Sequence, residues 1–230
     1  MSPSQQKQKL LRSAVEGDAA AASNLLRRDG TVGPNVLALA SDGDGGSYQC
    51  APLLMAAGHG HADVVQLLLE AGADPNTADS NGNLPLTVAA MQSHEDVARL
   101  LMDGGADPSA AADNEEGDTP LTLAAIQGCL GIVRLLLVEG GVDANALGPD
   151  GCAALHSAHA LGHEEVVRLL LDHGACRKVG TGREWPPPPE CAGCRVCSWR
   201  AACSCARCLS EELRTSVLLA REENGRRGRG

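Results

Sequence analysis

Six of the ten cysteines in this sequence lie close together near its C-terminal end. Between residues 191 and 208 they follow the pattern Cys-x2-Cys-x2-Cys-x5-Cys-x-Cys-x2-Cys. Two Cys-x2-Cys pairs flank this pattern, Cys191 with Cys194 and Cys205 with Cys208. Because each pair lets two thiolates reach one tetrahedral zinc ion, the two pairs together predict a structural zinc site. The same pattern also leaves open an unfolded Cys-rich tail, and a redox-active or disulfide-forming one.

A second group of metal-ligating residue types consists of Cys152, His156, His159 and His163. On one helix this spacing would bring such side chains to one face. His156 and His163 stand, however, at positions that recur along the chain, where local hydrogen bonds explain a histidine without a metal. We therefore assign no metal to this group.

No catalytic constellation is present in the sequence. It contains no phosphate-binding Gly-Lys loop, no Gly-x-Ser-x-Gly elbow and no metal-hydrolase helix. The sequence therefore favours a protein that is not an enzyme and that has no small-molecule substrate.

The composition indicates what kind of scaffold positions these residues. The 230 residues are 43% hydrophobic but include no Phe, one Tyr and two Trp. A core of Leu, Val, Ile and Ala suits short, closely packed helices better than a β-sandwich or barrel. No apolar run approaches the roughly 18 residues of a membrane span, and the first residues lack the apolar stretch of a secretory signal. We expect a cytoplasmic protein that does not contact membranes, and nothing in the sequence argues against the nucleus.

The charge is distributed unevenly along the chain. Up to residue 180, 10 Lys and Arg oppose 23 Asp and Glu, a balance of −13, whereas the remaining 50 residues carry 9 Arg against 6 Glu, a balance of +3. An acidic body repels a phosphate backbone, so we expect no specific binding of nucleic acid. The same charge favours a basic partner.

Four segments of the chain can be laid on one another. Their first motifs share one position at a spacing of 33, 35 and 34 residues, occupied by Pro52, Pro85, Pro120 and Ala154. Each motif leads into a Leu-rich run such as residues 64–69, and each run ends in a Gly with an Asp-Pro-Asn-like tail such as residues 72–76. Four matches at nearly one period predict a repeat architecture.

The physical reading of one unit is a pair of short helices. The Pro sets the first helical turn, where its missing N–H has no cost. Gly60 and His61 then break the first helix, and the Val-Val-x-Leu-Leu-Leu run has the spacing of a second one. A Gly such as Gly72 ends that helix, and the Asp- and Asn-rich residues after it form a turn.

This pattern resembles the ankyrin repeat. The resemblance covers residues 46–178, as units 46–79, 80–113, 114–147 and 148–178, and residues 1–45 contain a degenerate capping repeat and a Gly- and Asp-rich loop. It implies an all-α fold, a solenoid of helix-turn-helix units with projecting β-turn fingers and a concave face. Three departures from the family pattern are the missing His in residues 119–122, Cys129 in place of the usual His, and His159 in place of a packed Ala.

The resemblance also implies where a partner binds. In the ankyrin family, partners usually bind across the fingers and the exposed face of the first helices. Met91, Ile126 and Leu161 are apolar at such positions, where charged or small polar residues would be ordinary. A partner side chain or helix could cover this strip, together with the neighbouring exposed residues His59, Gln92 and Gln127. The alternative is that the apolar residues pack beneath neighbouring fingers.

The expected fingers supply negative charge beside the strip. We assign to the partner surface three polar residues of one finger and three acidic residues of the next: Thr77, Asp79, Asn81, Asp113, Glu115 and Glu116. Acidic fingers next to an apolar strip would steer a basic, amphipathic peptide toward it. A charge run kept for solubility is the alternative.

The sequence thus predicts a non-catalytic protein–protein interaction module or scaffold, whose repeat array needs no cofactor. Residues 179–190 are a Pro-rich linker, and residues 191–230 form the Cys-rich tail, in which Ser210 begins a terminal helix. A ubiquitin-pathway or regulatory adaptor, with this tail as a zinc module for a second protein, is the alternative function. A thiol sensor that uses the tail cysteines is a third.

Overall fold

The computed structural model describes residues 2–28, 33–41, 47–113, 118–146 and 154–175. These residues form successive pairs of antiparallel helices, which we number as units 1 to 5. The pairs are α1 (Pro3–Glu16) with α2 (Ala19–Arg28), α3 (Pro52–Gly58) with α4 (Ala62–Glu70), α5 (Pro85–Met91) with α6 (Glu95–Asp103), α7 (Pro120–Gln127) with α8 (Leu130–Arg134), and α9 (Ala154–Ala160) with α10 (Glu164–Asp172). A π-helical turn, η1 (Leu135–Glu139), continues α8.

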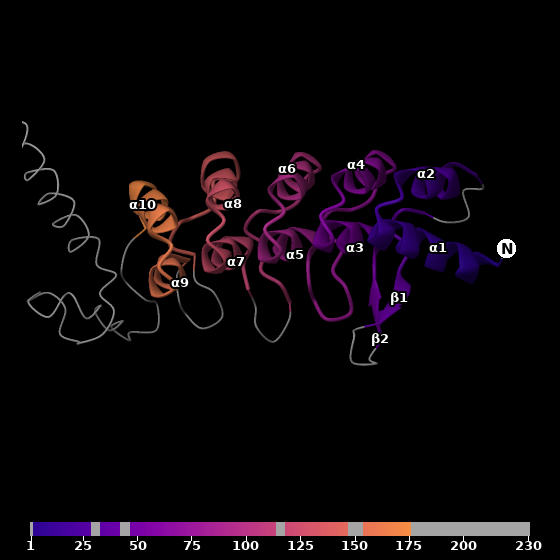
Figure 1. Ribbon diagram of the computed structural model, residues 1–230, viewed down its shortest axis with the longest axis horizontal. Helices are drawn as coiled ribbons and strands as arrows, with labels where there is room; N and C mark the ends of the chain where they lie inside the picture. The colour runs from indigo at the N-terminus through magenta and orange to yellow at the C-terminus, as the bar shows by residue number, and fades with distance from the viewer. Residues whose placement is uncertain (1, 29–32, 42–46, 114–117, 147–153, 176–230) are drawn as a thin grey trace, which may run out of the picture.

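The pairs stack side by side into an elongated array (Figure 1). The first helices of the pairs form one layer and the second helices form another. The segments that connect one unit to the next, the fingers, project from the first helices on the side away from the second helices (Figure 1). The array therefore presents three parallel rows: second helices, first helices and fingers.

Three of the first helices begin in the same way. Pro52, Pro85 and Pro120 each occupy the first helical position, after a residue with an extended backbone. Proline fixes its own φ near the helical value and disfavours the helical conformation of the residue before it, so each helix starts at a defined position. In units 3 and 4 a threonine hydroxyl also accepts the first free N–H, from Leu84 N to Thr87 Oγ1 at 3.1 Å and from Thr119 N to Thr122 Oγ1 at 3.0 Å.

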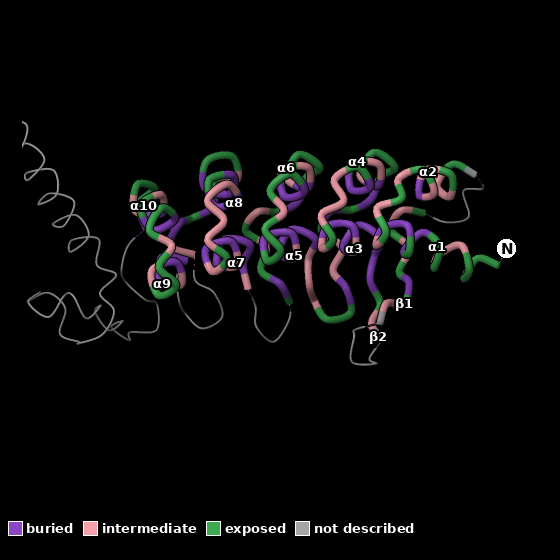
Figure 2. Tube along the Cα trace, in the orientation of Figure 1, coloured by how far each residue is buried: buried purple, intermediate pink, exposed green. Residues whose placement is uncertain are grey.

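One continuous aliphatic core lies between the two helical layers (Figure 2). Small residues such as Ala56 and Ala57 are fully buried in the first helices, and the second helices bury a stripe such as Val64, Val65 and Leu68. Alanine lets the first helices approach closely, while the branched side chains fill the space toward the second layer. Because alanines and branched aliphatic side chains together fill the core, the array packs without phenylalanine.

The connection between units 1 and 2 corrects one expectation. The sequence predicts a Gly- and Asp-rich loop within residues 1–45 and an all-α fold. The structure contains instead an antiparallel hairpin, β1 (Ala38–Ser41) with β2 (Ser47–Cys50), in which Ala38 lies opposite Cys50. Ala38 and Cys50 are buried with Leu11 and Leu54 in a small second core, so alternate residues of the hairpin pack inward. This packing, which short-range patterns do not reveal, turns the loop into two strands.

Neighbouring fingers are joined through their backbones. The amide of Ser80 donates to the carbonyl of Gln49 at 2.9 Å, and the amide of Gln49 donates to the Ser80 hydroxyl at 3.0 Å. One finger further along, the amide of Asp113 donates to the carbonyl of Gly82 at 2.9 Å. These bonds join the first three fingers of the array to one another.

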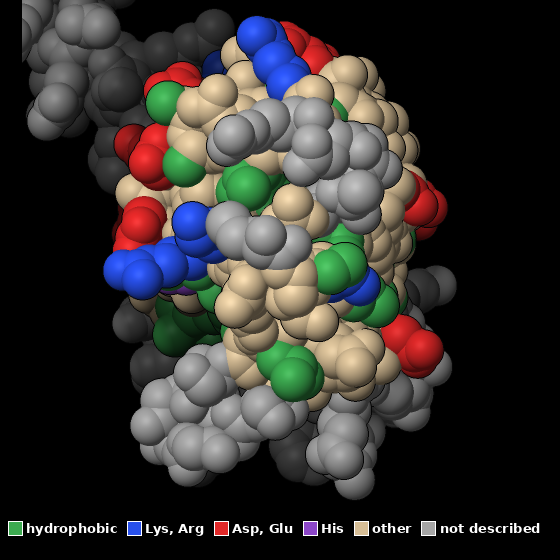
Figure 3. Space-filling view, turned by 90° about the vertical axis from the view of Figure 1, so that its right-hand side faces the viewer, with side chains coloured by type: hydrophobic (Ala, Val, Ile, Leu, Met, Phe, Trp, Pro, Cys, Tyr) green, Lys and Arg blue, Asp and Glu red, His purple; other side chains and the backbone are tan. Residues whose placement is uncertain are grey.

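The N-terminal unit differs from the others in charge. The end of the array carries Lys and Arg side chains, with Asp and Glu toward its rim (Figure 3). All five basic residues of unit 1 lie on α1 and α2, whereas only Arg99, Arg134 and Arg168 are basic in the other described residues. The acidic character of the protein thus belongs to units 2 to 5. No helix among the described residues combines the length and the apolar character that crossing a bilayer requires.

Candidate functional site

The predicted apolar strip lies at the ends of successive first helices. Met91 ends α5 and is 41% exposed, and Leu161 follows α9 and is 55% exposed. Ile126, near the end of α7, is half-buried. Gln92, Gln127 and His59 at the adjacent positions are exposed. The structure therefore places all six residues along the row of first helices, and Ile126 contributes the least surface.

A small cavity opens beside Met91, between α5 and α7. Its volume is about 50 Å³, and its walls include Thr87, Met91 and Leu123, with Asn83 and Asp118 from the fingers. Apolar side chains thus form the interior wall, and polar finger residues stand beside them. A space of this size admits part of one side chain, not a small-molecule ligand. Leu123 was not singled out from the sequence, because only the tertiary contact between two units brings it to Met91.

The finger residues assigned to the partner surface divide into two kinds. Asn81 and Asp113 are exposed and Thr77 is half-buried, whereas Asp79 is only 9% exposed. One carboxylate oxygen of Asp79 accepts the backbone N–H groups of Asn81 and Asn83, at 2.9 and 2.8 Å, and the other accepts the Asn83 side-chain amide at 3.1 Å. The buried Asp79 carboxylate therefore stabilises the conformation of its own finger through these hydrogen bonds. Glu115 and Glu116 lie outside the described residues.

Asp79 also affects the thiol beneath the finger. Cys50 is fully buried, and this burial, together with the negative charge of Asp79, raises the pKa of its thiol from 9.0 to about 11. Both causes act against the thiolate, because burial removes its hydration and the carboxylate repels it. Cys50 is accordingly a packing residue and not a nucleophile at neutral pH.

We expect alkylation of Cys50 by iodoacetamide to be slow at pH 8 and to accelerate as the pH approaches about 11. Because the folded state holds the Cys50 proton more tightly than the unfolded state does, ionisation of this thiol lowers the free energy of unfolding only as the pH rises above 9.0. Peptide mass spectrometry after timed alkylation measures the reaction at each cysteine. The half-buried Cys129 is the internal control, and equal rates at both sites at pH 8 would contradict the expectation.

The structure does not test the predicted zinc site. Cys191, Cys194, Cys205 and Cys208 lie outside the described residues. Among residues that are described, no group of three or more His, Cys, Asp and Glu side chains is placed to hold a metal. His163, from the second group, directs Nε2 to the carbonyl of Ile126 at 2.9 Å, which is a bond to the preceding unit and not the local bond that the sequence suggested.

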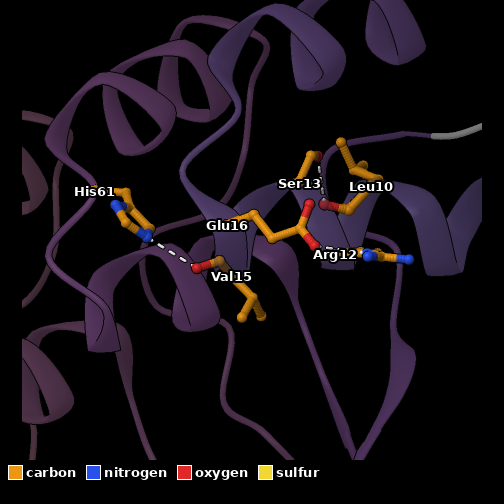
Figure 4. Close-up of polar contacts among 6 residues, drawn as sticks. All are labelled: Leu10, Arg12, Ser13, Val15, Glu16 and His61. Carbon is orange, nitrogen blue, oxygen red and sulfur yellow. Dashed lines mark hydrogen bonds and ion pairs between the residues drawn. The ribbon is translucent and has the colours of Figure 1, made fainter.

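That histidine contact recurs between other units. His61 Nε2 lies 2.9 Å from the carbonyl of Val15 (Figure 4). His94 Nε2 lies 3.2 Å from the carbonyl of Gly58. In each case a ring at the start of a second helix contacts the end of the first helix of the preceding unit. These residues do not line the candidate surface, but they fix the spacing of the first helices that carry it.

Comparison with known proteins gives one finding. A family model described as ankyrin repeats (3 copies) matches residues 10–112 and again residues 105–179. No curated protein matches the sequence.

Proposed function

Because the chain belongs to the ankyrin repeat family, whose arrays generally mediate protein–protein interaction, we propose that it is a non-catalytic binding module. Its partner surface consists of the apolar strip on the first helices and the exposed residues of the adjacent fingers. In this proposal the protein acts in the cytoplasm as a scaffold, and units 2 to 5 recognise the partner. Affinity without turnover is the expected behaviour.

The exposure of two large apolar side chains supports this surface. Among the described residues, the exposed large hydrophobics are Leu37, Leu39, Met91, Val138 and Leu161. Two of these belong to the strip, whereas the other large aliphatic side chains of the described array are buried or partly buried. Leaving such side chains in water is unfavourable by about 25 cal/mol for each Å² that a partner could bury. The exposure of Met91 beside the cavity is the observation that carries the proposal.

Charge supports a basic, amphipathic partner. Asp107 and Asp113 are exposed near the fingers of unit 3, and Arg99 is the single basic residue of that unit. A peptide with cationic residues would be drawn to this face, and an apolar side chain of the peptide would cover Met91 and enter the cavity. The attraction is between exposed charges, so it should weaken as salt concentration rises.

Replacing Met91 by glutamate tests the surface. Peptides selected from a random display library on the full chain serve as probes, and fluorescence anisotropy measures their affinity. We expect Met91→Glu, and separately Ile126→Glu, to weaken binding at least about tenfold, because a buried carboxylate would face the apolar side of the peptide. The selected peptides should be enriched in Lys and Arg.

Val138→Glu is the matched control. Val138 is 60% exposed on η1, in the row of second helices, so the substitution makes the same chemical change away from the strip. It should leave affinity unchanged, and circular dichroism should show the same helix content in all variants. Unchanged binding in both strip variants would rule out the proposed surface.

The cysteine pattern of residues 191–208 favours a second candidate function, an adaptor whose tail is a zinc module for another protein. Elemental analysis of the reduced full chain tests it, with a chain that ends at Gly180 as control. We expect one equivalent of zinc in the full chain and none in the control, because all four proposed ligands lie beyond residue 180. If the full chain contains no zinc, the adaptor function is ruled out and the binding module remains.

A further inference from the structure

Most junctions between units share one interlock. A histidine ring at the start of a second helix hydrogen-bonds to a carbonyl of the preceding unit, as described for His61, His94 and His163. Each ring also lies over a glycine with a left-handed backbone, at Gly17, Gly60 and Gly128. A Cβ at Gly60 would come within 2.7 Å of the His94 ring. The glycine is therefore needed twice, for its φ of +75° and for the room it leaves.

The junction between units 3 and 4 differs at both of these positions. Ser93 replaces the glycine and is the one described non-glycine residue with a positive φ, +64°. Cys129 replaces the histidine, and its Sγ lies 2.6 Å from the Ser93 hydroxyl. A histidine ring would collide with the Ser93 side chain, whereas the smaller cysteine reaches only the Ser93 hydroxyl. This junction therefore lacks the bond from a ring to a backbone carbonyl.

A second interlock, between the turns that follow the second helices, is missing at the same place. Asn76 donates to the carbonyl of Gly105 at 3.1 Å and accepts the amide of Asp107 at 2.9 Å. Asn35 makes the same two bonds to unit 2, and Asn145 donates in the same way to the carbonyl of Gly174. Ser109 occupies this position in unit 3. Serine is too short to bridge two backbone groups, and within the described chain its side chain makes no bond to Gly141 or Asp143.

The second helix of unit 4 carries a third irregularity. Together α8 and η1 span one residue more than α4, α6 or α10. The extra residue is accommodated as a π turn, in which the amide of Gly140 donates to the carbonyl of Leu135 at 3.0 Å. Single π turns of this kind mark an inserted residue and often occur at functional positions.

Contacts across this junction in the second-helix row include an exposed ion pair besides apolar packing. Arg99 on α6 forms an ion pair with Glu139 on η1 at 2.9 Å, and both side chains are about half exposed. Exposed ion pairs contribute little to stability and are screened by salt. The first helices α5 and α7 still pack through apolar residues such as Leu86, Leu121 and Ala124. The junction is therefore held by the apolar core, the Ser93–Cys129 contact and an exposed ion pair, without the two interlocks of the other junctions.

We propose that this junction is a built-in weak link, which divides the array into two units of folding, residues 2–113 and residues 118–175. Residues 118–175 unfold together while residues 2–113 remain folded. Met91 lies on one side of the link and Ile126 on the other, so a partner that covers both would hold the link closed. That consequence rests on the proposed function, whereas the link itself rests on the junction geometry alone.

Native-state hydrogen exchange at low urea, read by mass spectrometry on the full chain without any ligand, tests the link. In the wild-type chain we expect amides of α8 and α10 to exchange through one shared opening, and those of α4 and α6 to stay better protected. The repaired variant Ser93→Gly, Cys129→His, Ser109→Asn restores both interlocks. It should raise the protection of α8 and α10 about tenfold, toward that of α4 and α6.

Two results would overturn the proposal. One is that, in the wild-type chain, the amides of α8 are as well protected from exchange as those of α6. Faster exchange of α10 alone would then be fraying at the end of the array. The other is unchanged protection of α8 in the repaired variant. Both exchange measurements are made without a ligand, so their results do not depend on the peptide-binding test. The weak link and the proposed function are therefore judged separately.

The converse variant places the defect in a regular junction. Gly60→Ser with His94→Cys and Asn76→Ser should create a second boundary, between α4 and α6, with lower protection on the C-terminal side of it. Cys129→His alone serves as a further check, because the new ring meets Ser93 and should lower the protection of α8. An increase instead would show that Ser93 does not exclude the ring and would contradict the argument.

Discussion

Replacing Gly60 by alanine should lower the free energy of unfolding by about 2–4 kcal/mol, through backbone strain and a lost interlock. Gly60 has a φ of +75°, at which an L-residue with a Cβ is strained by about 1–2 kcal/mol. The new Cβ would also displace the His94 ring, and the carbonyl of Gly58 would lose its hydrogen bond. Urea denaturation followed by circular dichroism measures the loss.

Gly72→Ala separates the two causes. Gly72 has a φ of +88°, but no atom lies within 4 Å of the position of its Cβ. The substitution should therefore have only the effect of backbone strain, about 1–2 kcal/mol. Equal losses at Gly60 and Gly72 would mean that the histidine interlock does not contribute measurably to stability.

Replacing Asp79 by alanine should also lower the free energy of unfolding by about 2–4 kcal/mol. The substitution removes three hydrogen bonds to one carboxylate and leaves the backbone N–H groups of Asn81 and Asn83 without their acceptor. Bonds to an ionised acceptor contribute more than neutral ones. Since Asp79 is one of two causes of the raised pKa of Cys50, the same variant should lower that pKa and speed alkylation of this thiol.

Asp113→Ala is the control for charge. Asp113 lies in the neighbouring finger and is exposed, so its removal should change stability by no more than about 0.5 kcal/mol. Both variants remove one negative charge from the fingers, and only Asp79→Ala removes the internal bonds. Comparable losses in the two would indicate that overall charge, and not the bonds within the finger, determines stability.

Much of the architecture could be predicted from local patterns. The recurring Pro at positions 52, 85 and 120 fixes where helices begin, and this effect acts within a few residues of the chain. The Val and Leu spacing of the second helices marks the buried stripe for the same reason. The family match to residues 10–112 and 105–179 confirms the resemblance drawn from these patterns.

The candidate site was predictable only in part. Met91 and Leu161 were identified because alignment of the units shows an apolar residue where the pattern is polar, and both are exposed. The inward position of Asp79 and the cavity walls at Leu123 and Asn83 were not predicted. A single sequence gives the residue type of a finger carboxylate, but its direction depends on which backbone N–H groups the folded finger brings within reach.

By itself, then, the sequence determined the period, the helix starts, the aliphatic core residues and the family, because each shows as a pattern of residue types within one unit. Tertiary structure alone decided the pairing of residues 38–41 with residues 47–50 and the pairing of Ser93 with Cys129. The physical reason is that these features depend on contacts between units. Residues far apart in the chain, such as Ser93 and Cys129, must lie together before the size of one side chain can restrict the other.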